Sequence, residues 1–90
     1  MFIKIPNYYI DIHDWSEKEK DRPFIILNTK YIVSVNPLIV NYGEREAYYV
    51  EVTATNGRTF QFSFLNKKTA DEYIELMQTN NMVIEWEKQY

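Results

Sequence analysis

His13 is the only histidine in the chain, and it lies close to two carboxylates. On an alternating strand it would share a face with Asp11, and Asp14 is its chain neighbour. Imidazole and carboxylate groups are ligands of divalent metal ions. Metal sites usually need three or four protein ligands with supporting hydrogen bonds. We therefore expect His13 to be solvated and the protein to hold no metal.

Carboxylate pairs are a second candidate for chemistry, because glycoside hydrolysis needs two carboxyl groups that face one cleft. Glu85 and Glu87 form one such pair, and Asp71 and Glu75 form another, but both fall on expected solvent faces. The serines lie in no nucleophile-elbow pattern, two glycines are too few for a phosphate loop, and cysteine is absent. We expect neither an enzyme nor a cofactor.

Aromatic residues are abundant, with eight Tyr, five Phe and two Trp. Phe60, Phe62 and Phe64 alternate as base-stacking residues do, but only Arg58 is near enough to hold a phosphate backbone, so we expect them in the core. A small core cannot bury all the other aromatics, and exposed Tyr and Trp are typical of protein contacts. The residues that we expect to bind a partner are Trp86, Tyr90, Glu85, Glu87 and Trp15.

The charge is weakly acidic, with ten basic and thirteen acidic residues and a net charge of -3. Residues 46–90 carry all of the acidic excess, and no basic stripe is present, so we expect no direct binding of nucleic acid. No apolar run approaches the roughly 20 residues that span a bilayer, and Met1–Ile12 lacks the apolar region of a secretion signal. We expect a cytoplasmic protein that does not bind a membrane.

Ninety residues indicate a single domain over residues 1–90. Period-two alternation predicts strands at Phe2–Ile5, Tyr8–His13, Phe24–Leu27, Tyr31–Val35 and Leu38–Tyr42. We interpret the charged stretch Asp14–Arg22 as a solvated loop or a brief helical turn capped through the Asp14 and Glu17 spacing. Asn36 and Pro37 should close a strand, because proline cannot donate to a ladder.

The hairpin within Tyr48–Phe64 has a register that can be argued from its turn. A two-residue Asn56-Gly57 loop would put the apolar residues of the two strands on opposite faces. A three-residue loop that starts at Thr55 puts them on one face, and Gly57 then takes the left-handed position of a bulged type I turn. The pairs expected are Val52 with Phe60, Val50 with Phe62, Tyr48 with Phe64 and Glu51 with Gln61.

One amphipathic helix is expected from Thr69 to Thr79, with a capping box formed by Thr69 and Glu72. It should cover the phenylalanine face through an apolar stripe of Ala70, Tyr73, Ile74 and Met77. Asn80 and Asn81 should end the helix. The alternation in Met82–Trp86 then predicts a final edge strand.

The order of elements in Ile25–Met77 carries a resemblance. It runs through a strand, Asn28-Thr29-x-x-Ile32, another strand, the Asn56-Gly57 hairpin and the helix. This resembles small bacterial and phage domains of the PH-like or flagellar FlbD-like kind, in which a curved antiparallel sheet is closed by one helix. The resemblance implies an interaction module of bacterial, phage or mobile-element origin, with no catalytic residues to carry over.

The expected fold is therefore α+β, an antiparallel, strongly twisted sheet of about five to seven strands with one amphipathic helix near the C-terminus. We expect a non-enzymatic protein-protein interaction module, which binds a second copy as a homodimer or a host or regulatory protein. The alternative is an acidic inhibitor or regulator of a nucleic-acid-binding protein; a small enzyme or metal protein using His13 comes third. The acidic face of that alternative would comprise Asp71, Glu72, Glu75, Glu85 and Glu87.

Overall fold

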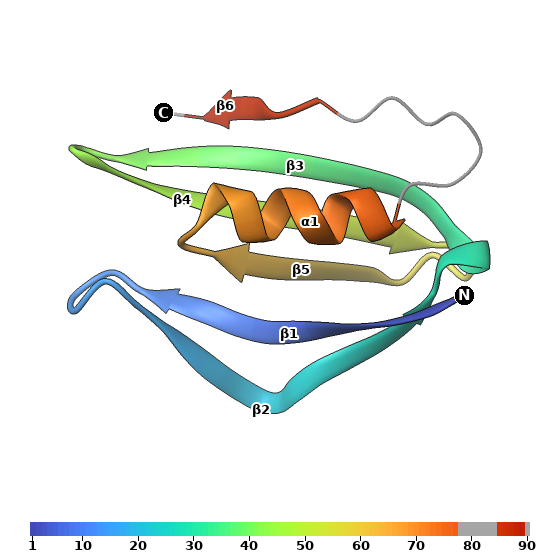
Figure 1. Cartoon of the computed structure of the whole chain (residues 1–90). Coiled ribbons are helices and arrows are strands. Elements are labelled where there is room, and N and C mark those ends of the chain that lie inside the picture. The colour runs from blue at the N-terminus through green and yellow to red at the C-terminus, as the bar shows by residue number, and fades with distance from the viewer. Residues whose placement is uncertain (78–84, 90) are drawn as a thin grey trace.

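The structure, a computed structural model, describes residues 1–77 and 85–89. The described residues form six strands and one α-helix (Figure 1), which confirms the α+β class, although the five to seven strands were expected in a single sheet. In chain order the elements are β1 (Phe2–Asp11), β2 (Ser16–Asn28), a 3-10 turn (Thr29–Tyr31), β3 (Ile32–Tyr42), β4 (Arg45–Ala54), β5 (Thr59–Phe64), α1 (Lys67–Met77) and β6 (Glu87–Gln89).

The strands belong to two sheets. β1 and β2 form an antiparallel hairpin, and the other four strands have the order β5-β4-β3-β6. β6 runs parallel to β3 and pairs Glu87 with Leu38, so the larger sheet is mixed, whereas a wholly antiparallel sheet was expected. β1 lies beside β5 (Figure 1), which places the β1–β2 hairpin next to the larger sheet.

The β4–β5 hairpin has the expected register, with Val52 opposite Phe60 and Val50 opposite Phe62. Gly57 has a φ of +84°, the left-handed conformation that the bulged turn requires. Its N–H donates to the Ala54 carbonyl at 2.9 Å, and the Ala54 N–H donates to the Arg58 carbonyl at 2.9 Å. These bonds close the three-residue loop and confirm the prediction.

The charged stretch Asp14–Arg22 is mostly strand, and its interpretation as a loop or helical turn is wrong. β2 begins at Ser16. Two of its charged side chains reach backbone groups in and just after β5: Glu17 accepts from the Leu65 N–H at 2.9 Å, and Lys20 donates to the Gln61 carbonyl at 3.3 Å. The charges are compatible with a strand because β2 lies at a sheet edge, where charged side chains are favoured.

β2 bends in the middle, as Figure 1 shows. The register shifts there, because Pro6 lies opposite Phe24 while Tyr8 lies opposite Glu19. The longer β2 segment between these pairs bulges out of the ladder. Asn7 supports the bulge by donating its side-chain N–H to the Arg22 carbonyl at 2.9 Å.

β3 continues through Pro37, so the expected strand end at Asn36 and Pro37 is wrong. Pro37 lies opposite Val50 of β4. On the other side of β3, the described pairing with β6 covers only Leu38–Val40. Pro37 lies one residue outside that pairing, where a missing N–H on this side removes no described ladder bond.

Helix α1 begins at Lys67, two residues earlier than expected. The Asn66 side chain accepts from the Lys68 N–H at 2.9 Å, and the Asn66 carbonyl accepts from the Ala70 N–H at 3.2 Å. Asn66 is therefore the N-cap, and the predicted capping box at Thr69 is wrong. The described helix extends to Met77, and the expected end at Thr79 lies outside the described residues.

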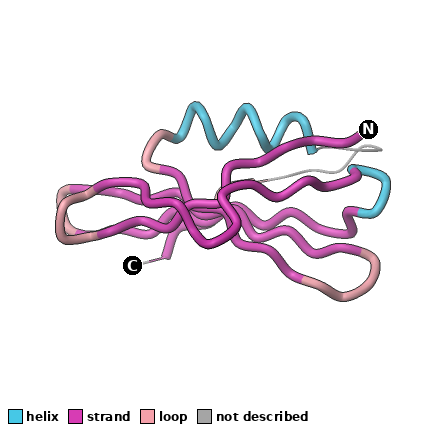
Figure 2. Tube along the Cα trace, turned by 90° about the horizontal axis from the view of Figure 1, so that it is seen from below, coloured by secondary structure: helices cyan, strands magenta, loops and turns pink. Residues whose placement is uncertain are grey.

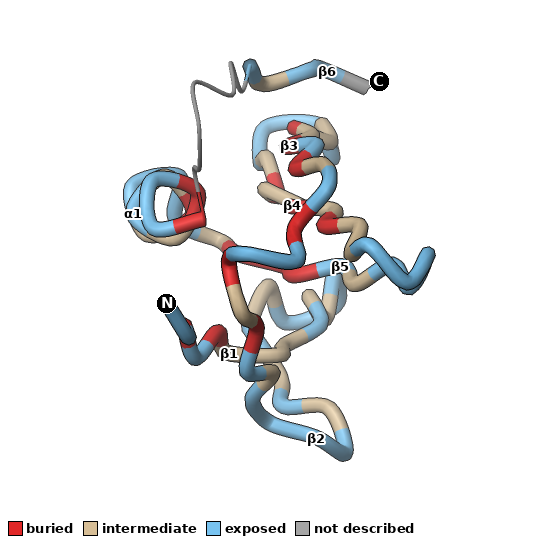
Figure 3. The backbone as a smooth tube through the Cα atoms, turned by 90° about the vertical axis from the view of Figure 1, so that its right-hand side faces the viewer, coloured by how far each residue is buried: buried red, intermediate tan, exposed pale blue. Residues whose placement is uncertain are grey.

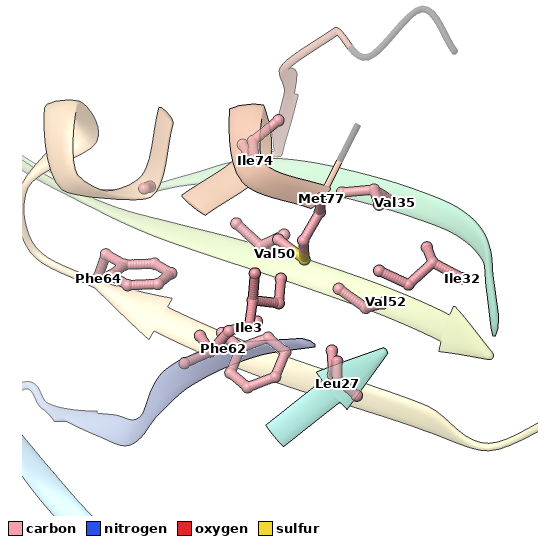
Figure 4. Packing of buried hydrophobic residues seen from close by; sticks show 12 residues of the cluster. Ile3, Leu27, Ile32, Val35, Val50, Val52, Phe62, Phe64, Ile74 and Met77 are labelled. Atoms are coloured by element: carbon pink, nitrogen blue, oxygen red, sulfur yellow. The ribbon is translucent and has the colours of Figure 1, made fainter. Parts of the chain in front are cut away.

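The core lies between α1 and the strands, and Figure 2 shows the helix on one side of the strand layer. Ala70, Ile74 and Met77 of α1 are buried, as the stripe predicted. Tyr73 stacks on Phe64, with ring centroids 5.6 Å apart. The β1–β2 hairpin contributes Ile3 and Leu27 to the same cluster, which Figure 4 shows around Phe62.

Candidate functional site

The described residues enclose no pocket, and they contain no group of three or more side chains arranged to hold a metal. His13 is exposed in the turn between β1 and β2, and its backbone N–H donates to the Asp11 carboxylate at 2.9 Å. The hydrogen bond from Ser16 and the ion pair with Lys18, at 2.9 Å, lower the pKa of Asp14. Both carboxylates near His13 are thus engaged in shaping the turn.

Trp15 joins two strand turns. Its backbone is left-handed, with a φ of 54°, which is unusual for a large side chain. The ring meets the edge of Tyr42 with centroids 5.7 Å apart, and the Arg45 guanidinium lies 5.5 Å from its centroid. Trp15 is half-buried, so much of the surface of this side chain, which we expected to bind a partner, already contacts residues of its own chain.

Tyr42 extends this aromatic cluster to Tyr49. Their hydroxyl groups are 3.0 Å apart. Burial, followed by the hydrogen bond with Tyr42, raises the pKa of Tyr49 well above its ordinary value. Tyr49 therefore stays neutral over the physiological pH range, and Arg45 already lies against the Trp15 ring of this cluster.

Trp86 also makes intramolecular contacts. Its indole N–H donates to Asp71 at 2.8 Å, and its ring meets Tyr48 edge-on at 5.7 Å. Lys67 pairs with Asp71 at 3.0 Å. Burial opposes the ionisation of Asp71, but the hydrogen bonds from Lys67 and Trp86 outweigh it and lower its pKa.

The other expected binding residues have less defined surroundings. Glu85 and Glu87 are exposed on either side of Trp86. Tyr90 lies outside the described residues, as do residues 82–84 of the expected strand Met82–Trp86. The described strand at this edge begins one residue after Trp86.

The expected acidic face is not a uniform set of free carboxylates. Glu72 and Glu75 are exposed on α1. Asp71, in contrast, is half-buried and holds both Lys67 and Trp86.

A different surface, which sequence reasoning missed, lies on the outer side of the β1–β2 hairpin. Phe2, Phe24 and Ile26 are 72%, 44% and 66% exposed. Their neighbours in the chain alternate inward, and Ile3 and Leu27 reach the core. Figure 3 shows buried segments on β1, whereas β2 is mostly exposed. We call Phe2, Phe24 and Ile26 the outer apolar face.

The register places the outer apolar face on one side of the hairpin. Phe2 lies opposite Asn28, Lys4 opposite Ile26, and Pro6 opposite Phe24. The Lys4 ammonium lies 4.1 Å from the centroid of the Phe24 ring. A signal was present in the sequence: four consecutive apolar residues, Phe24–Leu27, must fill both sides of a strand, because side chains alternate. Only one of those sides faces the core.

No family model matches the chain, and neither a curated protein nor a solved structure matches it. The likeness to PH-like and FlbD-like domains therefore stays a prediction, resting on the order of elements alone. Within residues 1–77 and 85–89, no helix is long and apolar enough to cross a membrane.

Proposed function

We propose that this protein is a non-enzymatic interaction module that binds protein through the outer apolar face of the β1–β2 hairpin. The observation that carries the proposal is the exposure of Phe2, Phe24 and Ile26 on one side of two paired strands. Single exposed apolar residues are ordinary on a protein surface, but neighbouring ones rimmed by polar groups mark interaction sites. Asn28 supplies a polar residue at one end of this face, and Lys4 lies within it, opposite Ile26 and against the Phe24 ring.

The energetics favour a protein contact. Fully burying a Phe or Ile side chain contributes about 1.5 to 3 kcal/mol. Phe2 and Ile26 have most of that contribution still available, because both are more than half exposed. Aromatic side chains at the centre of a contact are also among the residues that most often dominate binding energy. The outer apolar face is therefore suited to a specific contact of modest area.

The test uses the protein as bait in its native cell extract, with the captured proteins quantified by mass spectrometry. Ile26→Thr removes apolar surface while keeping a residue that favours strands. Val33→Thr is the matched control, because Val33 is 58% exposed on β3 and outside the outer apolar face. We expect Ile26→Thr to reduce a specifically captured protein about tenfold and Val33→Thr to leave it unchanged.

Two results would contradict the proposal. One is a partner that both variants retain equally. The other is a partner that wild type releases when salt is raised to about 0.5 M, because a contact made by charge alone weakens with screening whereas apolar burial does not. The second result would favour the acidic-regulator alternative.

A further inference from the structure

We propose that the free edge of β2 at Phe24–Asn28 binds an extended segment of a partner protein as an additional β-strand, and that this segment has alternating apolar residues with acidic flanks. The inference rests on the proposed function and names the chemistry of the partner. Three features of β2 carry it: its backbone edge, its charge pattern and the cations around it.

The direction of the backbone groups follows from one hydrogen bond. The Thr29 N–H donates to the Met1 carbonyl at 2.9 Å, one position beyond the pair Phe2 and Asn28. Hydrogen-bonded and non-hydrogen-bonded pairs alternate along an antiparallel ladder. Counting from Thr29, the backbone groups of Leu27 and Ile25 point toward β1.

The same alternation points the backbone groups of Phe24 and Ile26 away from β1. Pro6 lies opposite Phe24, and a residue without an N–H suits such a non-hydrogen-bonded pair. Pro23 lies beyond the last regular pair, Pro6 with Phe24, so its missing N–H falls outside the paired segment Phe24–Asn28. In the described residues, β2 pairs with β1 alone. The edge therefore offers donors and acceptors in the spacing that an added strand requires.

Charge confines strand addition to one half of β2. Every residue from Glu17 to Arg22 is charged. Charged side chains discourage an added strand, and Glu17 and Lys20 are in addition directed to Leu65 and Gln61. The segment Pro23–Asn28 carries no charge. This half of the edge lacks the protection that the other half has.

The surroundings of this uncharged segment determine its occupant. Lys4 lies directly opposite Ile26, and exposed Arg22 and Lys30 stand at the two ends. Asp21 is the acidic residue nearest to this segment in the sequence, and the protein as a whole has a net charge of -3. A second copy paired antiparallel about Ile26 would bring Arg22 of one chain opposite Lys30 of the other. Acidic flanks on a partner strand would instead meet these cations with opposite charge.

The probe is a synthetic nine-residue peptide, Asp-Glu-Val-Thr-Val-Thr-Val-Glu-Asp, added to the isotope-labelled protein and followed by NMR and amide hydrogen exchange. We expect slower exchange at the amides of Phe24, Ile26 and Asn28. The amides of Ile25 and Leu27 should gain little, because they already face β1. The matched peptide with Lys at all four acidic positions should bind about tenfold more weakly at low salt.

Two variants separate the backbone edge from the side chain. Ile26→Thr keeps the outward N–H and should weaken peptide binding about threefold. Ile26→Pro removes that N–H without removing a bond to β1 and should abolish binding. If the proline variant folds poorly, the alternating pattern of amide protection that the peptide induces in wild type still tests the proposal.

Three outcomes would overturn this inference. They are peptide-induced changes confined to another part of the chain, equal binding of the acidic and basic peptides, and concentration-dependent protection of Phe24 and Ile26 without peptide, which would identify a second copy as the occupant. If the peptide fails while Ile26→Thr still loses a captured partner, strand addition is wrong and the proposed function stands. If the peptide binds as expected but the Ile26→Thr variant still captures the partner at the wild-type level, strand addition stands and the proposed function is wrong.

Discussion

The indole N–H of Trp86 donates a 2.8 Å hydrogen bond to Asp71, and this bond ties the chain before β6 to helix α1. The Trp86 ring also packs edge-on against Tyr48. Trp86, which we expected to bind a partner, thus also fixes the C-terminal segment to the core. Its share in stability and its share in binding can be separated by substitution.

We predict that Trp86→Phe destabilises the fold by about 1 kcal/mol, because it removes the hydrogen bond to Asp71 and keeps a ring against Tyr48. Trp86→Ala should cost about 2 kcal/mol, since the packing is lost as well and the side chain is only partly buried. Urea unfolding measures both. Leu76→Ala, on the exposed side of α1, is the control and should change stability by less than about 0.5 kcal/mol. If the Trp86→Ala variant is as stable as wild type, Trp86 is not needed for stability and is available to bind a partner.

The carboxylate of Asp71 predicts a pH dependence. Its folded-state pKa is lowered by Lys67 and Trp86 against the opposing effect of burial. A group with a lowered pKa adds stability above its unfolded pKa, about 3.9, and loses it as the pH falls through the folded value. Asp71→Asn should therefore cost about 0.5 to 1 kcal/mol at pH 7, a figure reduced for the exposure of the ion pair to solvent.

Urea unfolding at pH 7, 5 and 3 tests this. The difference between wild type and Asp71→Asn should be constant from about pH 7 to 5 and shrink below about pH 4. Glu72→Gln, at the exposed neighbour, is the control. A difference between wild type and Asp71→Asn that persists undiminished at pH 3 would show that the charge of Asp71 is not its source.

Gly57 is predicted to be needed for its backbone conformation alone. Apart from its chain neighbours, no residue has an atom within 4 Å of the position that a Cβ would take here, so Gly57→Ala meets no steric obstacle from elsewhere in the fold, yet φ is +84°. We expect Gly57→Ala to lower stability by about 1 kcal/mol. Gly57→Asn should cost less, because asparagine tolerates the left-handed region. Equal thermal stability of wild type and Gly57→Ala would refute the bulged turn.

Trp15 combines an unfavourable backbone with favourable side-chain contacts. Trp15→Ala loses the contacts with Tyr42 and Arg45 and keeps the left-handed φ of 54°. Trp15→Gly loses the same contacts but relieves the backbone. We predict that the glycine variant is more stable than the alanine variant by about 1 kcal/mol, the reverse of their usual order in a strand. Thermal melts of both variants measure this, and the usual order would contradict the left-handed turn.

The sequence predicted those parts of the fold that are encoded locally. Gly57 and the alternation around it specify one register, so the β4–β5 hairpin was predicted pair by pair. The buried stripe of α1 was predicted for the same reason. Its start was not, because Asn66 and Thr69 are both good caps, and only the position of the preceding strand decides between them.

The errors fall where distant contacts override local preference. Charged residues from Glu17 to Arg22 have low strand propensity, and they lie in β2 because its backbone pairs with β1 and its side chains reach the β5 region. Pro37 ends strands in general but lies within β3, opposite Val50 and one residue before the part that pairs with β6. The outer apolar face was missed because which side of β2 faces the core depends on the packing of the whole hairpin.

The parallel pairing of β6 with β3 has a kinetic consequence. Neighbouring strands from β1 to β5 are joined by short turns, so their hairpins form by closing small loops, whereas Leu38 and Glu87 meet only across about half of the chain. Docking of β6 should therefore follow the folding transition state, and interactions formed after that point govern how fast a protein unfolds. Trp86 would then stabilise a contact that forms late in folding. Its removal should leave the refolding rate nearly unchanged and accelerate unfolding.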